Sequence, residues 1–203
     1  VKETAVAFVI ALAIGGWWFV RNALVYGGLD LLVWRRHDLV VQGQPLAGPF
    51  NLAFAKFFVT TTFQSFWAQF GWMGVLADER TYTLLGVLTS IGLAGMGLFL
   101  VRMIRHPSSE GSLSAAQSTC LLLMGATFAL VLGVLVFYNF RFVQAQGRYL
   151  FPALIPIALF FTLGLREIVA PRYAPVLFAV LYIALLALDY VCLTRFILPQ
   201  LTS

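Results

Sequence analysis

The polar residues best suited to chemistry lie in one short stretch between two apolar segments. Residues 138–152 (YNFRFVQAQGRYLFP) carry two guanidinium groups, three amides and two phenols. Gly147 allows close approach of the backbone beside Arg148, and a guanidinium can bind a phosphate through two parallel hydrogen bonds. The stretch therefore predicts phosphate binding by Arg141 and Arg148. The alternative is that both arginines anchor helix ends to lipid headgroups without specificity.

The residues that follow these arginines predict a helix that bends. Pro152 and Pro156 lie about one helical turn apart, so Pro156 deprives the carbonyl group of Pro152 of its usual amide donor. We expect the helix to loosen at this end and to open a cavity at headgroup depth.

Asp189 is the one acid inside an apolar run. An ionisable group at that depth is costly, and it usually faces a partner or a cavity. Two interpretations remain open. Asp189 forms a structural ion pair with an arginine such as Arg141 or Arg148, or it lines a substrate cavity.

Other site chemistries have no support in the sequence. Cys120 and Cys192 both fall in apolar runs and suggest neither a disulfide framework nor a zinc site. His37 and His106 stand in different loops, without a second ligand at metal spacing. There is no phosphate-binding Walker loop and no hydrolase or metalloprotease motif. We expect neither a metal nor a cofactor in this chain.

The composition indicates that the chain folds in a membrane. Hydrophobic residues make up 61% of the sequence and charged residues 10%, whereas about 25% of a soluble domain is charged. The net charge of +5 comes from basic residues scattered between apolar runs. Nucleic acid is therefore not an expected partner, and membrane lipid is.

The apolar runs predict an all-α integral membrane protein with about five transmembrane helices, in a single domain over 1–203. The spans are expected at about residues 5–20, 82–101, 118–138, 150–165 and 174–193. Between the first two lies an external segment, 21–81, with an amphipathic helix at about 53–71. This helix gathers Val59 and Phe63 on one face and Thr61 and Ser65 on the other, a pattern typical of a helix in the membrane interface. A sixth span here stays open as an alternative.

The distribution of arginines predicts the orientation. The short connections after the second and fourth spans carry Arg102, Arg105, Arg166 and Arg172, which places them and the N-terminus of this segment in the cytoplasm. The opposite face then holds eight basic residues, several of them at helix ends, and these include Arg21, Arg141 and Arg148.

Three blocks of sequence, in order, resemble a known family. They are residues 16–27 (GWWFVRNALVYG), 63–73 (FQSFWAQFGWM) and 147–156 (GRYLFPALIP). They are similar to segments of bacterial polytopic glycosyltransferases with the GT-C fold, the group that contains protein mannosyltransferase-like and aminoarabinose transferase-like enzymes and uncharacterised members.

The resemblance implies transfer of a sugar from a polyprenyl-phosphate donor at the external face of the cytoplasmic membrane, with a carboxylate as general base. Arg21, Arg141 and Arg148 would bind the lipid phosphate. The cavity would be lined by Asn22, Gln64, Trp67, Gln146, Tyr149 and Asp189. The acceptor, whether glycan, lipid or protein, and any divalent metal of the full-length protein stay open.

The chain also departs from the family pattern. Family members are normally much longer, with about twice as many spans, and the loop that carries their base has no counterpart here. Asp30 lies two positions later than the acid that follows the family's tyrosine and glycine, so no role passes to it. We therefore expect a C-terminal fragment that is inactive alone, with its catalytic base unknown. The rival hypotheses are a transporter or flippase subunit for a lipid-linked glycan, which would use the same arginines without chemistry, and a structural membrane module.

Overall fold

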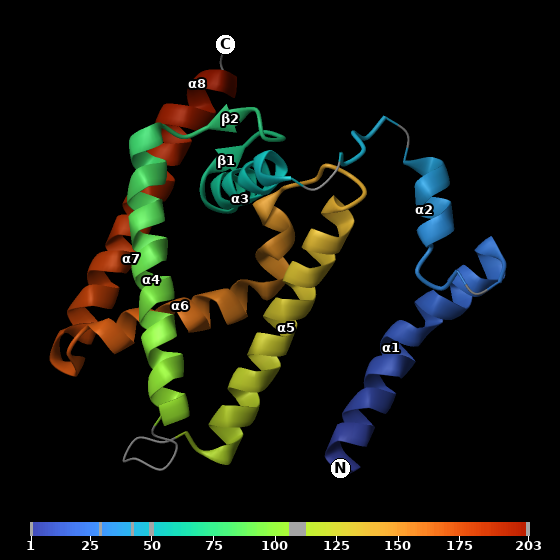
Figure 1. The fold of residues 1–203 in the computed structure, drawn as a ribbon, viewed down its shortest axis with the longest axis horizontal. Helices are drawn as coiled ribbons and strands as arrows, with labels where there is room; N and C mark the ends of the chain where they lie inside the picture. Colours follow the sequence, from blue (N-terminus) through green and yellow to red (C-terminus); the bar gives the residue numbers. More distant parts are fainter. Residues whose placement is uncertain (1, 29, 42, 49–50, 106–112, 202–203) are drawn as a thin grey trace. The chain divides into compact units, whose positions relative to one another are not determined.

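The chain is helical almost throughout the part that the structure describes. The structure is a computed structural model that describes residues 2–28, 30–41, 43–48, 51–105 and 113–201 (Figure 1). Internal contacts divide the chain into two compact units, residues 1–46 and 47–203, where the sequence predicted one domain.

The first unit contains one long helix and one short one. Helix α1 (Lys2–Tyr26) is one continuous and mostly apolar helix. It ends where Gly27 and Gly28 adopt left-handed backbone angles, with φ of 73° and 76°, which glycine reaches without steric cost. Helix α2 (Trp34–Val40) follows within the segment that the sequence left without structure.

The second unit begins with α3 (Leu52–Trp67) and a hairpin of strands β1 (Gln69–Phe70) and β2 (Val75–Leu76). The chain then continues through a series of helices, of which α6 packs on α4. These are α4 (Glu79–Arg105), α5 (Ala115–Asn139), the 3-10 helix η1 (Gly147–Ala153), α6 (Leu154–Ile168), the 3-10 turn η2 (Pro171–Tyr173), α7 (Ala174–Val191), the π-helical η3 (Cys192–Ile197) and α8 (Leu198–Leu201).

Five helical segments are long and apolar enough to cross a membrane, and they confirm the five predicted spans. They cover Ala5–Tyr26, Glu79–Arg105, Ala115–Asn139, Gly147–Ile168 and Pro171–Gln200. Each runs a few residues beyond its predicted bounds, because the helices continue into terminal turns that carry charged or polar side chains. The chain is a multi-span helical membrane protein.

Helices α4 and α6 cross through glycines. Gly92 and Gly95 on α4 are buried, as is Gly164 on α6. A Cβ atom on Gly95 would overlap the carbonyl group of Gly164, so the two backbones are in direct contact, as small residues allow between membrane helices. Beyond the crossing, Arg102 Nη2 donates to Glu167 Oε2 at 2.9 Å. This ion pair is partly exposed and contributes about 1 kcal/mol at most.

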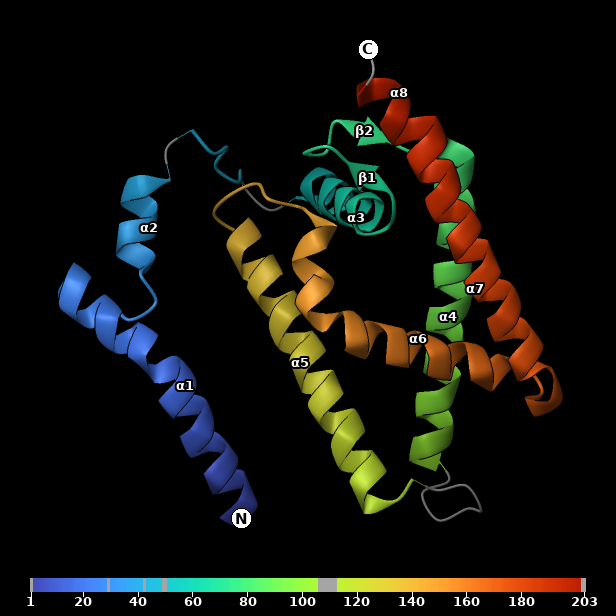
Figure 2. The same ribbon diagram turned by 180° about the vertical axis from the view of Figure 1, so that it is seen from behind.

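The segment that begins with η1 changes direction before it becomes α6 (Figure 2). Its first seven residues wind as a 3-10 helix that contains Pro152, and α6 begins at Leu154. The helix therefore has the loosened first turns that the two prolines predicted.

Helix α3 is shorter than predicted. It starts at its cap Asn51, whose Oδ1 accepts a hydrogen bond from the Phe54 amide at 2.8 Å, and it ends at Trp67 instead of residue 71. With 16 residues it is about 24 Å long, less than the roughly 30 Å of a hydrocarbon core, and it is not among the five candidate spans.

The hairpin after α3 is what ends the helix early. Gln69 pairs with Leu76 and Phe70 with Val75, and the hydroxyl group of Tyr82 on α4 holds the base of the hairpin. This hydroxyl donates to the Ala68 carbonyl at 2.8 Å and accepts from the Ala77 amide at 3.2 Å. The hairpin is thus fixed to the first turn of α4.

Asp78 caps α4 through its hydrogen bonds to Thr81. Its Oδ1 accepts hydrogen bonds from the hydroxyl group and the backbone amide of Thr81. The hydroxyl hydrogen bond is the main cause that lowers the pKa of Asp78 below its ordinary value. Because the pKa is lowered in the folded state, the stabilisation is present above the ordinary pKa and is lost as the pH falls through the lowered one. We expect Thr81→Val to raise the pKa of Asp78, as measured by a carboxyl-carbon NMR titration in micelles. An unchanged pKa would assign the shift to the backbone amide instead.

Candidate functional site

The polar stretch that follows α5 folds around Asn139, a buried side chain. Its Nδ2 donates to the carbonyl groups of Leu135 at 2.9 Å and Gln144 at 3.2 Å, and its Oδ1 accepts from the Gln144 amide at 2.8 Å. All polar atoms of this amide are therefore used within the turn. Asn139 fixes the path of the chain between α5 and η1.

The next contact joins this turn to α3 through Gly147. The amide of Gly147 donates to Ser65 Oγ at 2.6 Å, and Ser65 Oγ donates to the Thr61 carbonyl at 2.5 Å. A Cβ atom on Gly147 would overlap the Thr62 carbonyl and the backbone of Phe66. The polar stripe of α3 therefore faces η1 inside the protein at this point, so Ser65 contacts protein and not headgroups.

Arg148 follows directly and is exposed. Its Cζ lies 5.0 Å from the centroid of the Trp72 ring and 5.7 Å from that of the Tyr149 ring. Within the described residues its guanidinium makes no hydrogen bond or ion pair. Aromatic rings hold a guanidinium by its face and leave its in-plane N–H groups free. Arg148 is thus a positioned cation with donors available to a ligand.

Arg141 lies in the turn between α5 and η1. Its Cζ is 5.8 Å from the centroid of the Phe142 ring, and its carbonyl group accepts from the Ala47 amide at 2.9 Å. The latter bond joins this turn to the segment that precedes α3. Arg141 and Arg148 thus belong to one turn and one unit.

The predicted site residues on α1 belong to the other unit. Asn22 is 1% exposed, and its Nδ2 donates to the Leu31 carbonyl at 3.0 Å, so its amide holds the loop after α1. Arg21 Nη1 donates to Asn22 Oδ1 at 3.4 Å, and the Arg21 Cζ lies 5.9 Å from the centroid of the Tyr26 ring. These contacts give Asn22 a structural role. Whether the pair joins a site with Arg148 stays a prediction.

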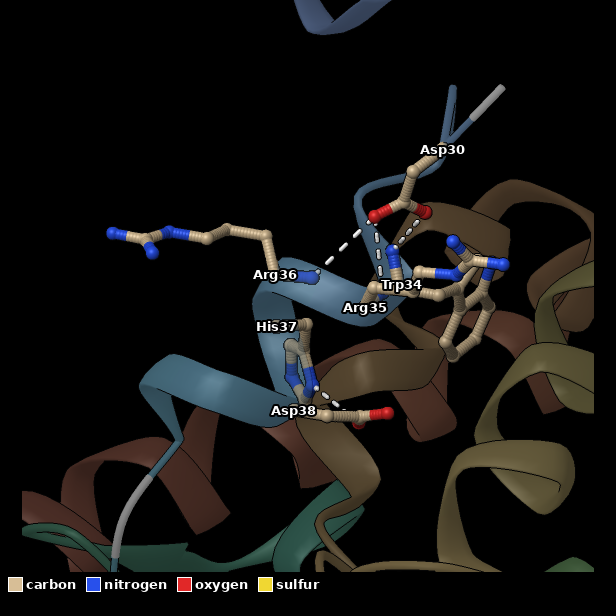
Figure 3. Close-up of polar contacts among 6 residues, drawn as sticks. All are labelled: Asp30, Trp34, Arg35, Arg36, His37 and Asp38. Carbon is tan, nitrogen blue, oxygen red and sulfur yellow. Dashed lines mark hydrogen bonds and ion pairs between the residues drawn. The ribbon is translucent and has the colours of Figure 1, made fainter. Parts of the chain in front are cut away.

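The carboxylate of Asp30 accepts hydrogen bonds from the backbone of α2 (Figure 3). Its two carboxylate oxygens accept from the amides of Trp34 at 2.8 Å, Arg35 at 3.0 Å and Arg36 at 3.4 Å. The side chain of Arg36 extends away from this carboxylate (Figure 3). In the same helix, His37 Nδ1 lies 3.6 Å from Asp38 Oδ1. Asp30 therefore caps the first turn of α2 with both carboxylate oxygens.

The remaining predicted cavity residues are dispersed. Gln64 lines an open groove of about 590 Å³ between α3, β2 and the start of α4, together with Glu79. Trp67 packs against the buried cluster of Ala68, Ala77 and Cys192. Gln146 Nε2 donates to Gln144 Oε1 at 3.0 Å, and the Tyr149 hydroxyl lies 3.5 Å from the same oxygen.

Asp189 lies on the exposed side of α7. In the part of the chain that the structure describes, it forms no ion pair with Arg141 or Arg148, and it does not line the groove. The predicted ion pair is therefore not formed among these residues.

The sequence did not predict that Trp72 and Ser65 contact the turn from Arg141 to Arg148. Trp72 is 87% exposed at the tip of the hairpin and contacts Arg148 from a position 76 residues earlier in the sequence. The flanking Gly71 and Gly74 are a turn signal that could have predicted a turn at Trp72 after the helix.

Metal ligands do not gather in the described part of the chain, where no group of three or more His, Cys, Asp or Glu side chains could hold an ion. His106 lies outside the described residues. Comparison of the chain with protein-family models, with curated proteins and with solved structures gave no match.

Proposed function

We propose that this chain forms the lipid-phosphate-binding part of a polytopic membrane glycosyltransferase that uses a polyprenyl-phosphate sugar donor. Arg148 is the primary phosphate ligand, and Arg141, in the same turn, adds positive charge. The observation that carries the proposal is the guanidinium of Arg148, which is held by the rings of Trp72 and Tyr149 while its donors stay free among the described residues. The three sequence blocks that resemble the GT-C glycosyltransferases supply the reaction class.

The position of Arg148 supports a lipid as the ligand. It is the second residue of the candidate span Gly147–Ile168, so it stands at an end of an apolar segment. The elements around it, α3, η1 and the hairpin, gather at the end of α4 that begins with Glu79, away from Arg102 (Figure 1). A phosphate held at this depth keeps its hydrocarbon chain in the membrane.

The chemical role of Arg148 would be to stabilise the leaving group. When the sugar departs, negative charge develops on the lipid phosphate, and a preorganised guanidinium lowers the energy of that charge. The general base is expected outside this chain. The chain alone would therefore bind the donor lipid without transferring the sugar.

Arg148→Ala tests the proposal. With the full chain in lipid nanodiscs, we expect the dissociation constant for polyprenyl phosphate to rise about 10- to 100-fold, because charge-assisted hydrogen bonds contribute about 1.5–3 kcal/mol. Arg148→Lys should give an intermediate loss, since it keeps the charge and loses the planar pair of donors.

Arg172→Ala is the matched control. Its Cζ lies 4.6 Å from the centroid of the Tyr173 ring at the start of the span Pro171–Gln200, so it is also an arginine stacked on a tyrosine at a helix start. We expect no change in binding from its removal. Equal losses from both variants would indicate general attraction to charge, and an unchanged affinity in Arg148→Ala would remove Arg148 from the site.

A further inference from the structure

The hairpin tip holds an indole ring out of the protein. Gly71, Trp72 and Met73 all have left-handed backbone angles, with φ of 54°, 56° and 71°. This conformation costs of order 1 kcal/mol or more at each non-glycine residue. The Gln69 side chain holds it by donating to the Met73 carbonyl at 2.8 Å, and the Gly74 amide donates to the Gly71 carbonyl at 3.1 Å.

The exposure of Trp72 calls for an apolar or amphipathic partner. The residue is 87% exposed, although burial of a large apolar side chain stabilises by about 1.5–3 kcal/mol. Leu76 in β2 is also 46% exposed. A turn that is strained and held outward therefore presents a ring that gains free energy when something covers it.

The depth of the tip points to lipid headgroups. The candidate span of α4 begins at Glu79, three residues after Leu76, and Tyr82 fixes the base of the hairpin to this helix. An extended segment of three residues spans about 10 Å, so Leu76 lies within about 10 Å of the start of this span. The interfacial layer beyond each side of the hydrocarbon core is about 5–8 Å thick. A tip fastened this close to the end of a span lies within or beside that layer.

The chemistry of the tip fits the same layer. Tryptophan is enriched at the membrane interface because its ring is apolar and its indole N–H is a donor. The guanidinium of Arg148, 5.0 Å from the centroid of this ring, is a partner for phosphate oxygens. Hydrocarbon would leave the cation unsatisfied, and water would leave the ring exposed. Phospholipid headgroups satisfy both groups.

We propose that the hairpin Gln69–Leu76 is a membrane anchor that places Trp72 among phospholipid headgroups and thereby sets the depth of Arg148. The anchor itself does not depend on the proposed function. The consequence for Arg148, a guanidinium held at the depth of the donor phosphate, rests on it.

Depth-dependent fluorescence quenching tests the anchor. The full chain is reconstituted in phosphatidylcholine nanodiscs that carry bromine on the acyl carbons nearest the headgroup or on those near the chain end. The emission of Trp72 is the difference between the unaltered chain and Trp72→Phe, and Trp72→Tyr assigns the same signal if the first variant does not fold. We expect emission blue-shifted from that of indole in water, and stronger quenching by the shallow bromines than by the deep ones.

Trp17 provides an internal reference for depth. It is 63% exposed and lies well inside the candidate span Ala5–Tyr26, so the difference between the unaltered chain and Trp17→Phe should respond to the deep bromines. Emission of Trp72 like that of indole in water, without quenching by either lipid, would overturn the anchor and indicate a solvent-exposed tip. Buried emission without quenching would overturn it in favour of a protein partner.

Binding of polyprenyl phosphate separates the anchor from the proposed function. Trp72→Ala should weaken binding less than Arg148→Ala, because it leaves the guanidinium in place and removes one supporting ring. If Trp72 is quenched at headgroup depth while Arg148→Ala binds normally, the anchor stands and the proposed function fails. If Trp72 is not quenched and Arg148→Ala loses binding, the reverse holds.

Discussion

Gly95→Val is expected to force apart the crossing of α4 and α6, with a loss of about 3 kcal/mol in the free energy of unfolding, the upper part of the usual range for overpacking. A Cβ atom on Gly95 would overlap the Gly164 carbonyl and would lie 2.9 Å from Ile168 Cδ1. The overlapped group is backbone, so no change of rotamer relieves the contact. Reversible unfolding in mixed micelles measures the difference.

Gly97→Val is the control for this substitution. Gly97 lies two residues further along the same helix, is exposed, and has no heavy atom within 4 Å of the position where its Cβ would lie. It shares the span and the change in side chain with Gly95, so it isolates the helix contact. We expect it to be neutral or slightly stabilising. A similar loss from both variants would show that the valine side chain itself, and not the crossing, is responsible.

Gly147→Ala is expected to separate η1 from α3, again with a loss of about 3 kcal/mol. The added methyl group would overlap the Thr62 carbonyl and lie 2.6 Å from the Phe66 Cα. Relief requires η1 to move away, which breaks the hydrogen bond from the Gly147 amide to Ser65. Hydrogen exchange at the amide of residue 147 should therefore accelerate together with the loss of stability.

A matched substitution is available in α5. Gly133 lies inside this helix with no heavy atom within 4 Å of a Cβ position, so Gly133→Ala should stabilise by about 0.5–1 kcal/mol through helix propensity. Ser65→Ala, which removes the acceptor and keeps the space, should cost about 1 kcal/mol. Unchanged stability and exchange in Gly147→Ala would mean that η1 does not pack on α3 in the membrane.

The spans could be predicted because their signal is local. Twenty apolar residues in a row have to satisfy their backbone internally, whatever surrounds them. The end of α3 could not be predicted in the same way, since it depends on Tyr82, whose hydroxyl group holds the chain at Ala68 and Ala77. Helix α2 was missed because its first turn is held by one carboxylate, Asp30, and has no apolar period of its own.

The candidate site was predicted as a segment but not as a set of contacts. The turn from Arg141 to Arg148 was predicted as polar from its composition. Adjacent residues on a helix point about 100° apart, so whether Gln64 or Ser65 meets Gly147 depends on the rotation of α3 about its axis. The structure selects Ser65 for Gly147 and places Gln64 in the groove beside Glu79. No periodicity in the sequence specifies that rotation.

The two arginines at opposite ends of this unit differ in the source of their counter-charge. Arg102 has Glu167 of the same chain beside it, with Nε and Oε1 2.6 Å apart, so the crossing of α4 and α6 carries its own neutralising anion. Arg148 has two rings and no carboxylate among the described residues. The charge of Arg102 is therefore balanced within the chain in any bilayer. Under the proposed function Arg148 takes its anion from the lipid, so its binding would depend on the composition of the leaflet that contacts it.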